Sequence, residues 1–130
     1  LLGEQHVRLD SQSRHAHGLD LGHQQAEPAS VVVYPANVEQ LVWLAKRLDR
    51  LKVYGAGSSL EGQVLAKGAI SLDLSRINKL LKLDTVLGVV RVQAGMRLKE
   101  LNEQLGEDWC FPVDPCYDGT VGGLLVTDAR

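Results

Sequence analysis

Cysteines and aromatic residues are scarce in this chain of 130 residues, and it contains no long apolar run. Cys110 and Cys116 are too few for a disulfide scaffold and their spacing matches no common zinc pattern, so we expect two reduced thiols. No apolar stretch approaches the roughly 18 residues that span a bilayer. The net charge of −2 offers no basic field for nucleic acid or for an anionic membrane surface. Composition therefore indicates a single globular domain with no nucleic-acid partner and no transmembrane segment.

What the chain does contain is a glycine loop directly after a short apolar run at 51–54. The loop reads Tyr54-Gly55-Ala56-Gly57-Ser58-Ser59. Two glycines one residue apart permit positive φ and keep Cβ atoms away from a ligand. Successive N–H groups in such a turn form a concave anion site, and the two hydroxyls can donate further hydrogen bonds. The Lys-Ser/Thr end of a P-loop and the third glycine of the dinucleotide fingerprint are both absent. By itself the loop predicts either a phosphate cradle or a tight turn that binds nothing.

Hydrophobic periodicity predicts a strand–helix–strand unit before this loop. The β-branched run Val31–Tyr34 predicts a strand, and Asn37 is expected to cap an amphipathic helix over 38–50. The second strand is 51–54, and the short connections indicate a parallel, right-handed βαβ unit. The other expected elements are strands over 69–74, 79–83 and 87–93, and an apolar stretch that begins at 120. A helix is expected between them, with Leu98, Leu101, Asn102 and Leu105 as its buried face.

Residues 1–27 are polar and rich in Gln and His, which predicts a poorly anchored lead-in with one short helix. His15 and His17, beside His23, could bind a metal. A solvated polar segment is favoured because no acidic or Cys partner lies at ligand spacing, so no metal site is predicted. The domain itself is then expected to cover residues 28–130.

Six segments, in order along the chain, carry a family resemblance. They are Val31–Pro35, Gly55–Gly62, Ile70–Asn78, Val92–Gly95, Phe111–Pro115 and Thr120–Gly123. Together they resemble the flavin-binding domain of the FAD-linked oxidases, the family with the vanillyl-alcohol-oxidase or PCMH-type fold. The resemblance covers about residues 28–127 and is greatest to the D-lactate dehydrogenase and glycolate oxidase D-subunit branch. It implies an α+β fold in which a small parallel βαβ subdomain is followed by the start of an antiparallel subdomain, truncated in this chain.

The resemblance also implies a cofactor, FAD, held between the two subdomains. The glycine loop would wrap its pyrophosphate, Pro112 and Asp114 would line the flavin side, and Thr120 with the paired glycines would approach the ribityl and isoalloxazine region. The implied cofactor-binding residues are Tyr54, Gly55, Ala56, Gly57, Ser58, Ser59, Pro112, Asp114, Thr120, Gly122 and Gly123. Some relatives attach the flavin through a histidine just after the glycine loop. Glu61 and Gly62 stand in that region here, which implies non-covalent FAD.

The implied activity is oxidation of a small 2-hydroxy acid, of the D-lactate or glycolate type, to the 2-oxo acid. In that branch the substrate arginines and the metal and catalytic histidines lie in a part that this chain lacks. We therefore expect no catalytic residue here, and the 2-hydroxy acid is a partner only of the full-length enzyme. A non-catalytic truncated remnant, or the FAD-binding part of another PCMH-type branch, are the alternatives. A cytoplasmic location is expected, with peripheral membrane association or a mitochondrial location left open for the longer protein.

Overall fold

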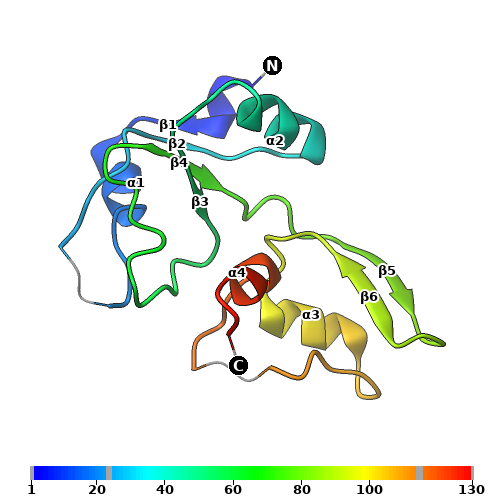
Figure 1. Cartoon of the computed structure of the whole chain (residues 1–130). Coiled ribbons are helices and arrows are strands. Elements are labelled where there is room, and N and C mark those ends of the chain that lie inside the picture. The colour runs from blue at the N-terminus through cyan, green and yellow to red at the C-terminus, as the bar shows by residue number, and fades with distance from the viewer. Residues whose placement is uncertain (1, 23–24, 114–115, 130) are drawn as a thin grey trace.

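The chain folds into two parts, each built around its own sheet (Figure 1). The computed structural model describes residues 2–22, 25–113 and 116–129. The first part, here called the sheet part, covers residues up to 78 and contains a four-stranded sheet. The second, the hairpin part, follows from residue 79 and contains a two-stranded sheet with two helices. The predicted α+β class, with a parallel sheet followed by an antiparallel one, is confirmed.

The sheet part has the strand order β1-β2-β4-β3. Strands β2 (Val31–Val33), β4 (Ile70–Asp73) and β3 (Leu51–Tyr54) run parallel, as predicted. The strands β2 and β3 of the βαβ unit are not neighbours, because β4 lies between them and pairs with both. Its central position explains why three successive residues of β4 are buried.

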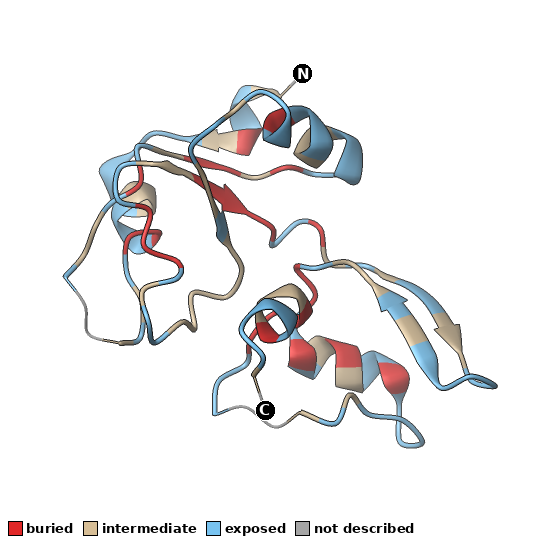
Figure 2. Cartoon of the chain, viewed as in Figure 1, coloured by how far each residue is buried: buried red, intermediate tan, exposed pale blue. Residues whose placement is uncertain are grey.

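Helix α2 (Val38–Ala45) covers one face of this sheet, and a loop packs on the other (Figure 2). The Asn37 side chain accepts a hydrogen bond from the Gln40 N–H at 2.9 Å, which is the predicted N-cap. The helix ends five residues earlier than the predicted 38–50, because the N–H groups of Arg47 and Leu48 share one carbonyl in a terminal turn. The cores of the two faces are Val33, Leu44, Leu72, Leu74 and Ile77 on the α2 side, and Ala29, Val32 and Ala66 on the other.

Residues 2–22 and 25–27 are well anchored, so the prediction of a loose lead-in is wrong for the part that the structure describes. A short 3-10 helix, η1 (Glu4–His6), leads into β1 (Val7–Arg8), which pairs antiparallel with β2. The single expected α-helix is present as α1 (Ser11–Ala16). Arg14 at its end donates a hydrogen bond to the Ala29 carbonyl at 2.8 Å. Backbone pairing and buried polar contacts, which composition does not report, provide the anchoring.

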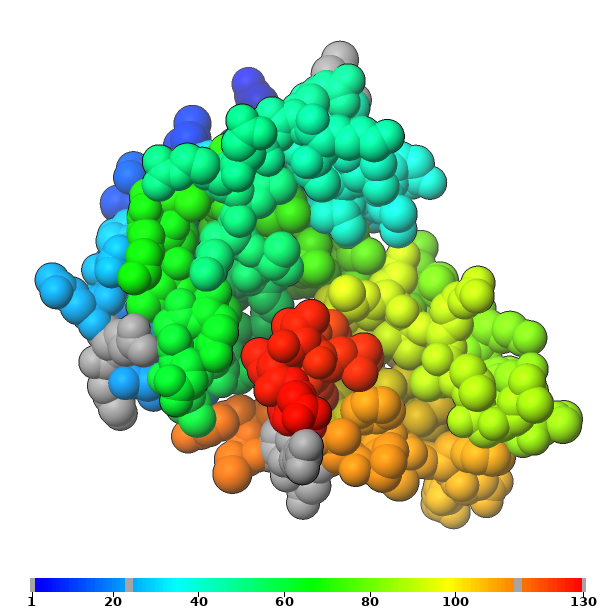
Figure 3. Space-filling view, viewed as in Figure 1, coloured from blue at the N-terminus to red at the C-terminus, as the bar shows by residue number. Residues whose placement is uncertain are grey.

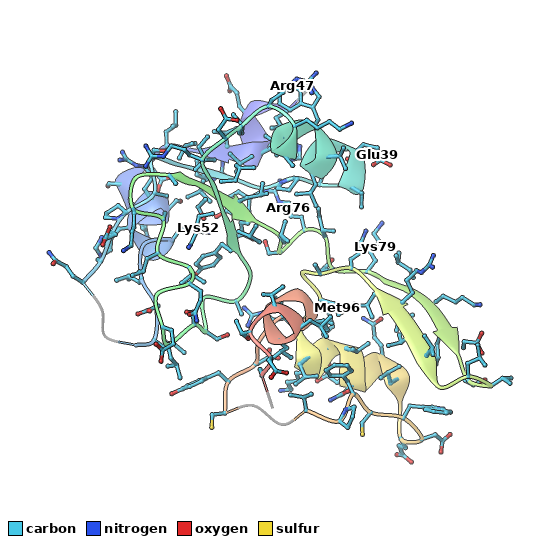
Figure 4. The ribbon with its side chains drawn as sticks, in the orientation of Figure 1. Glu39, Arg47, Lys52, Arg76, Lys79 and Met96 are labelled. Carbon is cyan, nitrogen blue, oxygen red and sulfur yellow. The ribbon has the colours of Figure 1, made fainter. Side chains whose placement is uncertain are left out.

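The hairpin part consists of β5 (Leu80–Asp84), β6 (Val89–Val92), α3 (Leu98–Leu105) and α4 (Val121–Val126). The strands pair antiparallel, and both helices pack on one face of the hairpin. Met96, labelled in Figure 4 beside α3 and α4, is fully buried in that core with Leu101, Leu105 and Val121. The apolar stretch expected from 120 is thus a helix. None of the helices in the described part of the chain is long and apolar enough to cross a membrane.

Candidate functional site

The glycine loop leaves β3 as the sequence predicts and bends at Gly57. Gly57 has φ of +71°, in the left-handed region where side chains are strained. A Cβ built on Gly57 would collide with the hydroxyl of Tyr54, the last residue of β3. The loop therefore needs glycine at this position for two reasons, backbone conformation and space.

A row of backbone N–H groups in this loop is left without internal partners. Within the described residues, none of the N–H groups of residues 55–60 has a hydrogen-bond acceptor. Residues 55–59 are nevertheless half-buried. The Ser59 hydroxyl is occupied by Gln63, to which it donates a hydrogen bond, whereas the Ser58 hydroxyl has no partner among the described residues. A row of adjacent N–H donors without acceptors in the protein is suited to an anionic ligand with several oxygens.

A second predicted segment lies against the loop, at the start of α4. A Cβ built on Gly55 would collide with the Thr120 hydroxyl, and one built on Gly119 would lie 3.6 Å from Ser58 Oγ. Figure 3 shows α4, in red, beside the green segment that includes the glycine loop. The structure thus brings together two of the three segments that the sequence predicted to hold a cofactor, one from each part of the chain.

The paired glycines at the start of α4 have packing partners of their own. The Gly122 N–H donates to the Ala94 carbonyl at 2.9 Å, and a Cβ on Gly122 would lie 2.8 Å from Cβ of Ala94. The Gly123 N–H donates to the Thr120 hydroxyl at 3.2 Å, which caps the helix. Close packing explains Gly122 without a ligand, and the role of both glycines toward a cofactor stays a prediction.

Comparison with known proteins decides the family. Residues 29–129 match the family model described as FAD binding domain. The chain belongs to this FAD binding domain family. The family resemblance and the PCMH-type fold predicted from the sequence are confirmed, and FAD is the cofactor that the family description names.

Relatives and solved structures agree with this assignment. The chain is 33% identical over 134 residues to a probable D-lactate dehydrogenase, mitochondrial, of Danio rerio, covering 98% of this chain and 27% of that protein. It is 32% identical over 132 residues to a D-lactate dehydrogenase [cytochrome], mitochondrial, of Arabidopsis thaliana, covering 95% and 23%. Two solved structures of alkyldihydroxyacetonephosphate synthase have the same fold. One superposes with a TM-score of 0.82 at 24% identity, covering 96% of this chain and 27% of that protein. The other superposes with a TM-score of 0.83 at 26% identity, covering 98% of this chain and 30% of that protein. The chain spans about a quarter of the length of these relatives.

The third predicted segment of the FAD binding domain is placed only in part. Pro112 is exposed, and no hydrogen bond among the described residues joins it to the glycine loop. The preceding Phe111 is fixed by its N–H, which donates to Asn102 Oδ1 on α3 at 2.8 Å. Asp114 lies outside the described residues. The roles of Pro112 and Asp114 on the flavin side therefore stay predictions.

A buried polar cluster behind the glycine loop was missed from the sequence. His17 Nε2 lies 2.9 Å from Asp73 Oδ2, and both side chains are buried. The His17 ring also packs against the Tyr54 ring in a tilted arrangement, with 4.2 Å between ring centroids and 45° between ring planes. The histidine was predicted to be solvated, yet a signal existed: Asp73 ends an apolar strand, and a buried carboxylate requires a partner. His15, two residues away, is exposed as expected, and His23 lies outside the described residues.

The geometry of this cluster favours a protonated histidine. His17 Nδ1 lies 2.9 Å from the Ser13 carbonyl, so both ring nitrogens face acceptors, and only an imidazolium donates to both. Burial is the largest influence on the His17 pKa and lowers it, but the hydrogen bonds to Asp73 and Ser13 and the Asp73 charge outweigh it. The pKa of His17 is therefore raised above its ordinary value. Burial, followed by the Asp73 charge, likewise raises the pKa of Tyr54.

Proposed function

We propose that this chain is the FAD-binding portion of an FAD-dependent oxidoreductase that oxidises a small 2-hydroxy acid, of the D-lactate or glycolate type, to the 2-oxo acid. The observation that carries FAD binding is the row of N–H groups at residues 55–60, which have no acceptor among the residues that the structure describes. The substrate class is supported by the two D-lactate dehydrogenases that match almost the whole chain. Because the chain spans about a quarter of their length, substrate binding and turnover belong to the longer protein. A mitochondrial location, which the relatives' names carry, is compatible with this proposal.

The residues present fit the pyrophosphate of FAD. The N–H groups of the glycine loop and the Ser58 hydroxyl would donate to its oxygens, and glycine at position 57 lets the loop take this shape without a Cβ colliding with Tyr54. Thr120, which contacts Gly55, would close the same site from the hairpin part. Bound FAD supplies the two-electron acceptor of the reaction. The chain's own contribution is to bind and orient it.

The flavin is proposed to be held without a covalent bond. Glu61 occupies the region where a histidine attaches the flavin in some relatives, and a carboxylate cannot form a histidyl bond. His17, which packs against Tyr54 at the start of the loop, is buried against Asp73.

A pair of glycine variants tests the loop. Gly57 and Gly68 both have positive φ, at +71° and +73°, so a side chain strains the backbone at either position. A Cβ on Gly57 collides with Tyr54, whereas a Cβ on Gly68 meets nothing within 4 Å. We expect Gly57→Ala to weaken FAD binding at least about tenfold, or about 1.4 kcal/mol, and Gly68→Ala to leave it unchanged. Flavin fluorescence quenching measures the affinity.

If the two folded variants bound FAD with equal affinity, the glycine loop would not be part of the FAD site. The same preparations report on covalent attachment: acid precipitation of the wild-type chain loaded with FAD should release all of the flavin into the supernatant. Colour that remains in the washed pellet would contradict non-covalent binding.

The substrate class requires the longer protein that contains this chain. Anaerobic addition of D-lactate or glycolate should bleach the flavin absorbance of that protein, because the substrate would reduce the bound flavin. Bleaching by neither acid, with FAD bound, would favour a non-catalytic remnant or another branch of the PCMH-type fold. The matched control is L-lactate, which has the same charge and composition but the opposite configuration.

A further inference from the structure

The glycine loop is held by a segment that lies outside the matched family domain. The family match begins at residue 29, whereas residues 17–22 contact the loop directly. The Gly62 N–H donates to Asp20 Oδ2 at 2.8 Å, and the Leu21 N–H donates to the Ser59 carbonyl at 2.9 Å. The second Asp20 oxygen accepts from the Gly22 N–H at 3.0 Å, which fixes the carboxylate. The C-terminal end of the loop is thereby tied to the N-terminal segment.

The same segment also supports the other end of the loop. His17 packs against the ring of Tyr54, whose hydroxyl lies against Gly57. Asp73 holds the His17 ring from β4 and accepts a second hydrogen bond from the Ser75 N–H at 2.7 Å. Successive contacts therefore connect the central strand with the bend of the loop: Asp73 contacts His17, His17 contacts Tyr54, and Tyr54 contacts Gly57.

A loop of this kind needs support from outside. The N–H groups of residues 55–60 have no acceptors among the described residues, so no hydrogen bond donated by this stretch of backbone fixes its shape before a ligand arrives. Holding the donors in place beforehand reduces the ordering cost that binding would otherwise incur.

We propose that residues 17–22 form a brace that preorganises the glycine loop for a pyrophosphate, with His17 and Asp20 as its positioning residues. The inference rests on the proposed FAD binding for its ligand. The inference goes beyond the proposed function because it assigns a role in binding to a segment that precedes the family domain. The residues of this segment would act through the loop and not by touching the ligand.

Asp20→Ala tests the C-terminal tie, with Asp49→Ala as the control at an exposed carboxylate. We expect Asp20→Ala to lower the backbone 15N order parameters of residues 55–60 and to weaken FAD binding about tenfold, the scale of one hydrogen bond to a charged group. Asp49→Ala should change neither quantity. A folded Asp20→Ala chain with an unchanged loop and unchanged affinity would overturn the brace.

His17→Asn tests the other end, with His15→Asn as its exposed neighbour. The groups that face the His17 ring are Asp73 from β4, Tyr54 from β3, Tyr34 after β2 and the Ser13 carbonyl. The pKa of His17 is raised above the ordinary histidine value of about 6.5. Below that ordinary value the ring is therefore fully protonated, and it loses its proton as the pH rises through the raised pKa. Loop order and FAD affinity should therefore fall with rising pH through the His17 titration, followed by its imidazole NMR signals.

His17→Asn should remove this pH dependence, and His15→Asn should retain it. A pH profile that is the same in wild type and His17→Asn would refute the role of His17, and Asp20→Ala decides the brace if His17→Asn does not fold. If the wild-type chain binds no FAD at all, the proposed function fails, and the order parameters still show whether residues 17–22 hold the loop.

Discussion

The sheet part and the hairpin part bury their strands to very different extents. Leu72, in the central strand β4, is 2% exposed, whereas Leu81, in β5, is 53% exposed. Strand β4 has neighbours on both edges and packed layers on both faces. The hairpin has helices on one face alone. A two-stranded hairpin is marginal without such packing, so α3 and α4 are what stabilise it.

This difference bears on how the site is built. The rigid sheet part supplies the glycine loop, directly after β3, together with its brace. The hairpin part supplies Thr120, which reaches the loop from α4. Its strands expose Leu81 and Val89, and the turn between them exposes Val86 and Leu87. Antiparallel sheets commonly have one packed face and one face in water. The better-packed sheet part therefore holds the N–H donors of the glycine loop, and the less-packed hairpin part contributes Thr120 on the other side of the site.

Two leucine truncations give the largest contrast between the parts. Leu72→Ala removes buried methyl groups from the middle of the sheet core and should lower the free energy of unfolding by about 3 kcal/mol. Leu81→Ala acts on a half-exposed position and should cost about 0.5 kcal/mol. Urea unfolding followed by circular dichroism measures both. Equal losses would show that the exposed face of the hairpin is covered in solution.

The sequence predicted those elements whose signal is local. The β-branched run of β2, the apolar spacing of α3 and the Asn37 cap each lie within one element, so the period and the capping residue were enough. The glycine loop was recognised for the same reason, because its glycines and hydroxyls are adjacent in the chain. Its anion-binding character then followed from backbone chemistry.

What was missed depends on contacts between distant residues. His17 and Asp73 are 56 positions apart, and nothing in a polar segment indicates that its histidine will be buried. Strand β1 has two residues and owes its place to pairing with β2. Helix α4 begins with paired glycines, which have low helix propensity, and forms because Thr120 caps it and Val121 packs on Met96. Tertiary contacts overrode local preference in each case.

Two buried hydroxyls, one in each part, give the smallest expected effects. Ser71, in β4, is fully buried, and its hydroxyl has no hydrogen-bond partner among the described residues, whereas the buried Thr120 hydroxyl accepts from the Gly123 N–H. Ser71→Ala removes an unsatisfied polar group and should leave the stability unchanged or raise it by up to about 1 kcal/mol. Thr120→Ala loses a helix cap and should cost about 1 kcal/mol, most of which Thr120→Ser should restore. The midpoints of urea unfolding separate these outcomes. If Ser71→Ala lost as much stability as Thr120→Ala, the Ser71 hydroxyl would have a hydrogen-bond partner. Both parts would then use their buried hydroxyls in the same way.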